Sequence, residues 1–255
     1  MAKLGDILLS CFAYGTMTLG VFLMVPFKMS KKLHEAYFAR FVLPIIMYLS
    51  GDRSNEVRRK AVSQLMGLVS HDAILKKEGA IRVLEIGAGF GANFAHIQRK
   101  VKYWNVDPNA EFNDGFRKNM EKYPNVEMEN WVHEYAEDMR GVPDGHFDVV
   151  LITYVLCSVA EMGKVLAECR RVLSKGGRLV FLEHVAHPEG SWSFFLQTLL
   201  DPMWSFSFCG CHVNRRPERL LKAAGFDQIE LSKVHLSLPT VLSPQVYGSA
   251  VVVKA

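Results

Sequence analysis

Short apolar runs alternate with helical patterns from residue 81 to the C-terminus. Runs typical of strands occupy residues 81–86, 103–106, 126–132, 147–154, 178–185, 228–235 and 246–253. Helical periods of apolar positions begin near residue 92 and cover residues 111–122, 160–173 and 216–224. This alternation predicts an α/β fold, a doubly wound, Rossmann-like, mostly parallel sheet with helices on both faces. The strongly β-branched run FDVVLITY at residues 147–154 predicts a strand buried on both faces, and the short link between the last two strands allows one to run antiparallel.

Residues 7–27 form an uncharged, mostly apolar stretch of 21 positions. About 20 helical residues cross the apolar core of a bilayer, so the stretch is long enough to span one. A signal peptide has a shorter apolar core and a small-residue cleavage site, whereas this stretch ends in Val-Pro-Phe-Lys. We therefore predict a hydrophobic membrane anchor helix within residues 1–30. A single span is favoured, and an in-plane anchor or hairpin remains open because a second apolar patch, residues 41–49, is too short to span.

Basic residues follow this apolar stretch. Between residues 28 and 60 there are eight lysines and arginines against three acids, while the whole chain carries a net charge of only +4. A basic cluster beside an apolar stretch is typical of a membrane flank, and only Lys3 precedes the stretch, so residues 28 onward are placed on the cytosolic side. We interpret residues 31–78 as a helical, basic, membrane-proximal segment with a second helix beginning at residues 52–55. We expect no nucleic-acid partner.

Composition excludes several other classes of protein. With 49% hydrophobic and 22% charged residues, the chain has the composition of a folded globular protein. Its five cysteines include no Cys-x-x-Cys pair, which argues against a disulfide framework and a zinc ribbon. Cys209, Cys211 and His212 are close together, but no further ligand has suitable spacing, so we predict no metal site. Cys157 is expected to be a small packed side chain.

The sequence VLEIGAGFG at residues 83–91 is a Gly-rich turn that follows a predicted strand. Its glycines allow a tight turn and a close approach of the backbone to a ligand. Asp107 lies 22 residues after Glu85, at the end of the next predicted strand, where a carboxylate can accept both ribose hydroxyls of an adenosine. A carboxylate at Glu85 would repel a pyrophosphate and suits a cationic ligand. The pattern therefore favours S-adenosylmethionine, with a nicotinamide dinucleotide as the alternative.

As a set, the motifs of residues 81–185 resemble those of class I S-adenosylmethionine-dependent methyltransferases. VLEIGAGFGAN resembles the first motif and NVDPN (105–109) the second, while PDGHFDVVLITYVLCSV (143–159) and AECRRVLSKGGRLVFLEHV (167–185) resemble the later ones. The resemblance implies a methyltransferase domain over residues 79–255, with the cofactor bound by Glu85, Gly87, Ala88, Gly89, Gly91, Asp107, Pro108, Ala136, Glu137 and Thr153. In many of these enzymes an acid before the Ala-Glu pair contacts the adenine amine, whereas Tyr135 stands at that place here.

A narrower resemblance rests on EHVA (183–186), LDPMW (200–204), CGC (209–211) and VYGSAVV (246–252) behind a hydrophobic N-terminus. These pieces are similar to the membrane-associated methyltransferase-like proteins of the endoplasmic reticulum and lipid droplets. The resemblance implies S-methylation of small hydrophobic thiols at the cytosolic face of those membranes. Two alternatives stay open, a methyltransferase acting on a lipid or quinone and a catalytically silent membrane scaffold that binds the cofactor.

Candidate acceptor-side residues follow the predicted fifth strand. A thiol reacts as its thiolate, and the pKa of a free thiol is about 8.5, so a nearby base helps the reaction. Ligands in this fold bind at the carboxyl ends of the strands, which makes His184 a candidate base. Asp201 can orient a base or cap a turn. The aromatic segment 191–208 can wall an apolar pocket that receives a lipid-like substrate.

Overall fold

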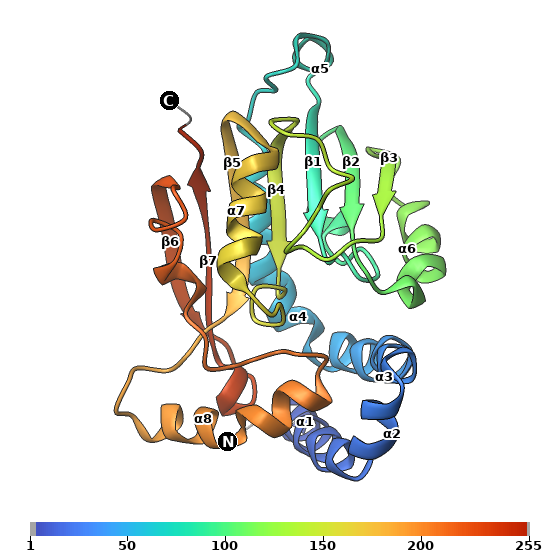
Figure 1. Cartoon of the computed structure of the whole chain (residues 1–255), viewed down its shortest axis with the longest axis vertical. Coiled ribbons are helices and arrows are strands. Elements are labelled where there is room, and N and C mark those ends of the chain that lie inside the picture. The colour runs from blue at the N-terminus through green and yellow to red at the C-terminus, as the bar shows by residue number, and fades with distance from the viewer. Residues whose placement is uncertain (1–3, 254–255) are drawn as a thin grey trace.

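A seven-stranded sheet forms the centre of the computed structural model, which describes residues 4–253. The strand order is β3-β2-β1-β4-β5-β7-β6 (Figure 1). The bounds are β1 (Ile81–Ile86), β2 (Val101–Val106), β3 (Val126–Val132), β4 (Phe147–Thr153), β5 (Leu173–His184), β6 (Asp227–His235) and β7 (Pro244–Val251). Strands β1 to β5 pair in parallel, and β7 runs antiparallel to both of its neighbours. The predicted doubly wound, mostly parallel sheet is confirmed.

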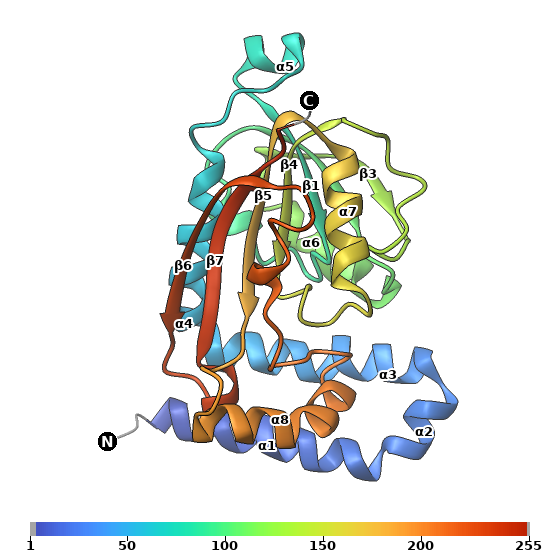
Figure 2. The ribbon, with the colours of Figure 1, turned by 60° about the vertical axis from the view of Figure 1, so that its left-hand side comes forward.

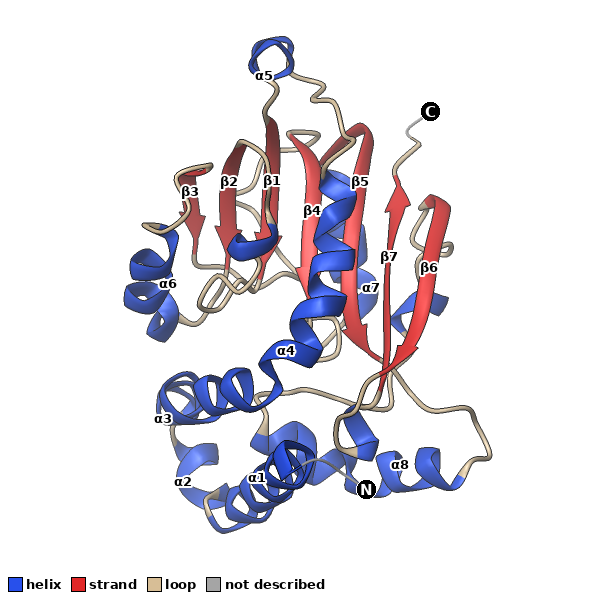
Figure 3. Ribbon diagram, turned by 180° about the vertical axis from the view of Figure 1, so that it is seen from behind, coloured by secondary structure: helices blue, strands red, loops and turns tan. Residues whose placement is uncertain are grey.

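Helices cover both faces of this sheet. The helices of the described residues are α1 (Leu4–Phe22), α2 (Met24–Met29), α3 (Lys31–Tyr37), α4 (Leu43–Val62), α5 (Ala73–Glu78), α6 (Asn113–Met120), α7 (Met162–Val172) and α8 (Trp192–Ser207), with a π-helical turn η1 (Phe38–Val42) before α4. Helix α7 lies in front of the sheet in Figure 1, and α4 lies across the other face in Figure 3.

Strand β4 is buried along its whole length, as its sequence predicted. Val150 and Ile152 pack in the cluster that includes the apolar side of α7. Val149 and Leu151 point the other way, into a cluster with residues at the end of α4. The period of two along a strand thus gives β4 a separate core on each face.

Three expected local features differ in the structure. From residue 92 the chain forms turns and a short 3₁₀ segment, η3 (Phe94–His96), because the buried Asn93 side chain is bonded to residues of β1 and β4 and holds the segment against the sheet. Residues 216–224 form only the 3₁₀ segment η5 (Pro217–Arg219) and turns. Helix α4 runs unbroken through residues 52–55, since a proline in its first turn is compatible with an earlier start.

A second layer of helices lies beneath the carboxyl ends of the parallel strands. Figure 2 shows α1 and α8 side by side in this layer, with α2 and α3 beside them. One stripe of α1 is buried there and consists of Leu9, Ala13, Thr16, Met17 and Gly20. By length and composition α1 could cross a membrane, so the expected apolar N-terminal helix is present. Lys3, the basic residue before it, lies outside the described residues.

Candidate functional site

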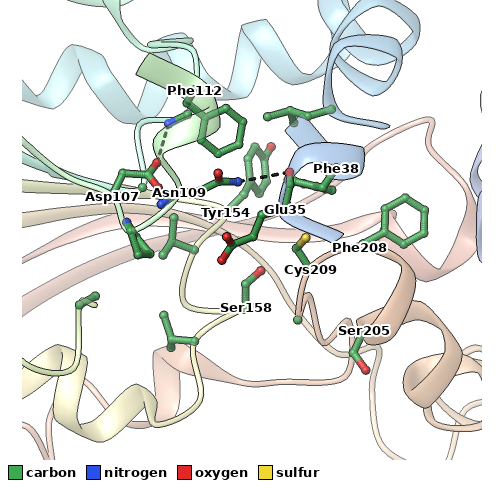
Figure 4. Close-up of a pocket in the computed structure, with 18 of the residues that line it drawn as sticks. Glu35, Phe38, Asp107, Asn109, Phe112, Tyr154, Ser158, Ser205, Phe208 and Cys209 are labelled. Atoms are coloured by element: carbon green, nitrogen blue, oxygen red, sulfur yellow. Dashed lines mark hydrogen bonds between the residues drawn. The ribbon is translucent and has the colours of Figure 1, made fainter. Parts of the chain in front are cut away.

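A cavity of about 1030 Å³ lies where the carboxyl ends of β1, β2 and β4 meet the second layer of helices. The loops after these strands line one side, and residues of α2, α3, α8 and the turn after α8 line the other. In the close-up of Figure 4, Asp107 lies on one side of this cavity, and Phe208 and Cys209 lie across from it. The volume is sufficient for a nucleoside-sized cofactor together with a small acceptor.

Asp107 lies at the cavity, directly after β2. Its Oδ1 accepts a hydrogen bond from the backbone N of Asn109 at 2.9 Å, and its Oδ2 accepts one from the N of Gly89 at 3.2 Å. Burial raises the pKa of Asp107 to about 6, and these two bonds oppose the rise. Each carboxylate oxygen can accept more than one hydrogen bond, so the group retains capacity for two ribose hydroxyls.

The Gly-rich turn lines the cavity beside Asp107. Gly87 has a φ of +66°, and a Cβ there would lie 2.5 Å from Cγ2 of Val155. Only glycine therefore fits between the turn and the loop after β4. The backbone of Gly87, Ala88 and Gly89 lines the cavity directly. This backbone surface is open to close contact with a ligand.

Glu85 is buried behind the turn and is not among the cavity-lining residues. Its Oε1 accepts a hydrogen bond from Nδ2 of Asn93 at 2.7 Å, and its Oε2 accepts one from the hydroxyl of Tyr103. Desolvation by burial raises the pKa of Glu85 to about 7. Nδ2 of Asn93 also donates a hydrogen bond to Oγ1 of Thr153 at 3.0 Å. Glu85 is therefore connected to the cavity lining through Asn93 and Thr153.

Arg58 of α4 brings a cation to this part of the cavity. Its Nη1 donates to Oδ1 of Asn93 at 2.8 Å and to Oγ1 of Thr153 at 2.9 Å. Arg58 and Thr153 line the cavity, so the guanidinium can pair with the carboxylate of an amino-acid group. The sequence interpretation missed Arg58, because it is one of several basic residues in a segment assigned to the membrane flank. No local spacing connects it to the Gly-rich turn.

Tyr135, Ala136 and Glu137 line the cavity next to Pro108. Nζ of Lys31 in α3 lies 4.4 Å from the centroid of the Tyr135 ring. Oε1 of Glu137 accepts a hydrogen bond from the backbone N of Ala160 at 2.8 Å. Tyr135 therefore adds an aromatic ring to the cavity lining, and Glu137 holds the loop after β4.

Asp201 and His212 form a hydrogen-bonded pair on the other side of the cavity, and both line it. Oδ2 of Asp201 lies 2.7 Å from Nδ1 of His212, and Oδ1 accepts a hydrogen bond from the backbone N of Val213 at 3.1 Å. A carboxylate beside Nδ1 favours the tautomer with its proton on Nδ1, which leaves Nε2 free to accept a proton. The sequence interpretation considered His212 only as a neighbour of cysteines. The pairing depends on the turn after α8, for which the sequence has no signal.

The structure brings most of the predicted site residues together and leaves three away from the cavity surface. The lining includes Gly87, Ala88, Gly89, Asp107, Pro108, Ala136, Glu137, Thr153 and Asp201. Outside it are Glu85, described above, together with Gly91 and His184. Gly91 supports the packing of Phe94, because a Cβ would lie 2.2 Å from that ring. His184 directs Nδ1 toward the sulfur atoms of Cys157 and Cys211.

Comparisons with known proteins agree on the class of protein. Residues 84–181 match the family described as Methyltransferase domain. Human thiol S-methyltransferase TMT1B is 34% identical over 236 residues, which cover 92% of this chain and 94% of that protein. Human thiol S-methyltransferase TMT1A is 36% identical over 174 residues, covering 68% and 71%.

Solved structures support the fold. A SAM-dependent methyltransferase from Thermotoga maritima superposes with a TM-score of 0.59 at 19% identity, covering 87% of this chain and all of that chain. Phosphoethanolamine N-methyltransferase 2 from Haemonchus contortus, solved with S-adenosyl-L-methionine, superposes with a TM-score of 0.56 at 14% identity, covering 78% and 53%.

Proposed function

Because the chain belongs to the family of the thiol S-methyltransferases TMT1A and TMT1B and is an S-adenosylmethionine-dependent methyltransferase, we propose that it methylates small hydrophobic thiols. The observation that carries this proposal is the Asp201–His212 pair on the acceptor side of the cavity. A thiol needs a base to form its thiolate near neutral pH, and this pair supplies one at the cavity surface.

The side of the cavity built by the strand-end loops would hold the cofactor. Asp107 would accept hydrogen bonds from the ribose hydroxyls, and the backbone of the 87–89 turn would pack against the amino-acid end. Arg58 pairs with the carboxylate of that end, held in place by Asn93 and Thr153. When bound, S-adenosylmethionine supplies an electrophilic methyl group on a sulfonium.

His212 and Asp201 prepare the acceptor for this transfer. Nε2 of His212 takes the proton from the S–H of the acceptor, and Asp201 orients the ring and stabilises the resulting imidazolium. The thiolate would then accept the methyl group that bound S-adenosylmethionine would supply, with the carbon–sulfonium bond breaking to leave S-adenosylhomocysteine. We assign the base to His212 rather than His184, because His184 does not line the cavity.

The acceptor side of the cavity is mostly apolar, which favours a hydrophobic thiol over a hydrophilic one. Its lining includes Met24, Phe38, Met47, Phe206 and Phe208. Removing an alkyl chain from water is favourable by about 0.8 kcal/mol for each buried CH₂. Longer alkyl chains should therefore lower KM until the pocket is filled.

The second layer of helices is proposed to lie on a membrane, at the cytosolic face of the endoplasmic reticulum or on a lipid droplet. Large apolar side chains are exposed on its helices, with Phe22 of α1 79%, Trp192 of α8 72% and Leu199 of α8 60% exposed. Lys28, Lys31 and Lys32 supply positive charge beside them, which suits an anionic membrane surface. Because one stripe of α1 is buried within the layer, this packing favours an in-plane anchor over a separate single span.

The test is transfer of a labelled methyl group from S-adenosylmethionine to hexanethiol, using membranes that carry the full-length chain. We expect a labelled thioether whose formation is lost in Asp107→Ala and strongly reduced in His212→Ala. Label in the lipid or quinone extract without any thioether would replace the thiol proposal with the lipid or quinone alternative. Binding of S-adenosylhomocysteine without any labelled product would support the scaffold alternative.

A further inference from the structure

Two cysteines and a histidine from three separate segments meet behind the acceptor wall of the cavity. Cys157 lies in the loop after β4, His184 ends β5, and Cys211 lies in the turn after α8. The sulfur atoms of the two cysteines are 3.5 Å apart, and each lies 3.7 Å from Nδ1 of the histidine. Neither the catalytic pair nor the cofactor side uses this cluster.

The three distances match the edges of a tetrahedral metal site. With metal–sulfur bonds of about 2.3 Å and metal–nitrogen bonds of about 2.0–2.1 Å, tetrahedral edges are about 3.8 Å between sulfurs and about 3.5 Å between sulfur and nitrogen. The observed separations differ from these by a few tenths of an ångström. Three ligand atoms therefore already surround one position at which a cation fits with minor side-chain rotation.

Charge and burial favour a divalent cation at this position. Cys157 is fully buried and Cys211 is 8% exposed. Two thiolates neutralise a doubly charged cation, and a neutral imidazole adds no charge, so the assembled centre carries no net charge into the interior. Thiolate and imidazole ligands together are typical of zinc sites.

Neighbouring contacts hold the three ligands in place. The backbone O of Cys157 accepts a hydrogen bond from the N of His212 at 2.7 Å, which joins the two loops directly beside the cysteines. The Tyr154 ring stacks on His184 with the ring centroids 4.5 Å apart. The Glu183 carboxylate accepts hydrogen bonds from the backbone N of residues 155, 156 and 157. The ligand-bearing backbone is thus fixed before any cation binds.

We propose that Cys157, His184 and Cys211 bind one Zn²⁺. Among the described residues no fourth His, Cys, Asp or Glu joins the cluster, so a water molecule takes the fourth position. The ion connects the loop after β4 to the turn after α8. Ser158 and His212, each next to a ligand in sequence, line the cavity, so the ion fixes the acceptor wall and the position of the base.

Zinc uptake by the reduced full-length protein in detergent tests the assignment, with Co²⁺ as a spectroscopic probe. We expect one Zn²⁺ per chain, release of two protons on binding, and sulfur-to-cobalt charge-transfer absorption when Co²⁺ replaces it. Cys157→Ser and Cys211→Ser should each lower the affinity at least about 100-fold and weaken that absorption. Cys209→Ser is the matched control, since it removes a thiol two residues from Cys211 that is outside the cluster, and should retain full uptake.

A second variant and a second measurement separate ligand loss from unfolding. His184→Asn should also lose Zn²⁺ while retaining the absorption spectrum of a folded chain and the affinity for S-adenosylhomocysteine. Absence of uptake by the reduced wild-type protein, or uptake that survives in both cysteine variants, would overturn the site. A reduced protein that takes up no metal, and in which mild oxidation forms a disulfide between Cys157 and Cys211, would also overturn the site. None of these results depends on which acceptor the enzyme methylates.

Discussion

The two sides of the cavity are built in different ways. The cofactor side comes from the loops after neighbouring parallel strands, with Gly87, Asp107 and Thr153 all within residues 81–153. The acceptor side comes from segments at opposite ends of the chain. There, Oγ of Ser207 in α8 donates to the backbone O of Met17 in α1, 190 residues away.

The two sides of the cavity also differ in their chemistry. The cofactor side is built on buried polar groups, including two carboxyls whose pKa values are raised by burial. The acceptor side combines apolar side chains with the hydrogen-bonded Asp201–His212 pair and with polar side chains of α2 and α3, among them Lys28 and Glu35. The cofactor side therefore follows a local motif, whereas the acceptor side depends on long-range packing.

His212→Ala should have the largest effect, and it should affect turnover on the acceptor side of the cavity without affecting the cofactor side. At neutral pH the turnover of a thiol should fall on the order of 100-fold or more, because the acceptor loses its base. The affinity for S-adenosylhomocysteine should stay unchanged, and the loss should shrink as the pH rises and thiolate forms without help. Turnover across a pH series and calorimetry measure both quantities. The exposed His235→Ala on β6 is the control, and a variant with full turnover at neutral pH would remove His212 from the mechanism.

Asp107→Ala tests the cofactor side by itself. Hydrogen bonds to a charged acceptor contribute about 1.5–3 kcal/mol each, so the loss of two should weaken cofactor binding at least about 100-fold. Calorimetric titration with S-adenosylhomocysteine measures the change. Asp114→Ala, which removes an exposed acid from the first turn of α6, should bind normally. An affinity within about twofold of wild type would contradict the assignment of Asp107 to the ribose.

A matched pair of glycine substitutions tests the long-range packing of the second layer. A Cβ at Gly20 would lie 2.1 Å from Oγ of Ser207, whereas a Cβ at Gly15 of the same helix meets nothing within 4 Å. Gly20→Ala should lower the free energy of unfolding by about 1–3 kcal/mol through overpacking. Gly15→Ala should leave it unchanged or raise it by up to about 1 kcal/mol. Denaturant unfolding in detergent measures both, and equal effects would mean that α1 does not pack on α8 as described.

The smallest expected effect is a pH dependence that moves affinity and stability in opposite directions. Below about pH 6 Asp107 becomes protonated, so cofactor affinity should fall about tenfold per pH unit. The pKa of Asp107 in the folded state lies above the ordinary aspartate pKa of 3.8, so the folded state binds more protons than the unfolded state between the two values. The ligand-free protein therefore gains stability as the pH falls through about 6. Calorimetry measures the cofactor affinity over this pH range, and denaturant unfolding measures the free energy of unfolding. Asp107→Ala should weaken both pH dependences.

Most strands and the core of the cofactor site were predictable from the sequence. Strand β4 is a continuous apolar run, and the Gly-rich turn and Asp107 follow successive strands, whose carboxyl ends meet at one edge of a parallel sheet. The helices expected near residue 92 and over 216–224 were wrong. In the first case the side chain of Asn93 bonds to the sheet, a contact that no periodic pattern reveals.

The fold class, the cofactor and most of the residues that line the strand-end side of the cavity therefore follow from the sequence, because all of these depend on short-range patterns and on strands that are neighbours in the sheet. The tertiary structure alone decided that Arg58 reaches the cofactor side, that Asp201 pairs with His212, and that Cys157, His184 and Cys211 converge. These groups come from helices and loops far apart in the chain. Their meeting depends on how α4 and α8 pack against the sheet, which is a property of the whole core rather than of any spacing along the sequence.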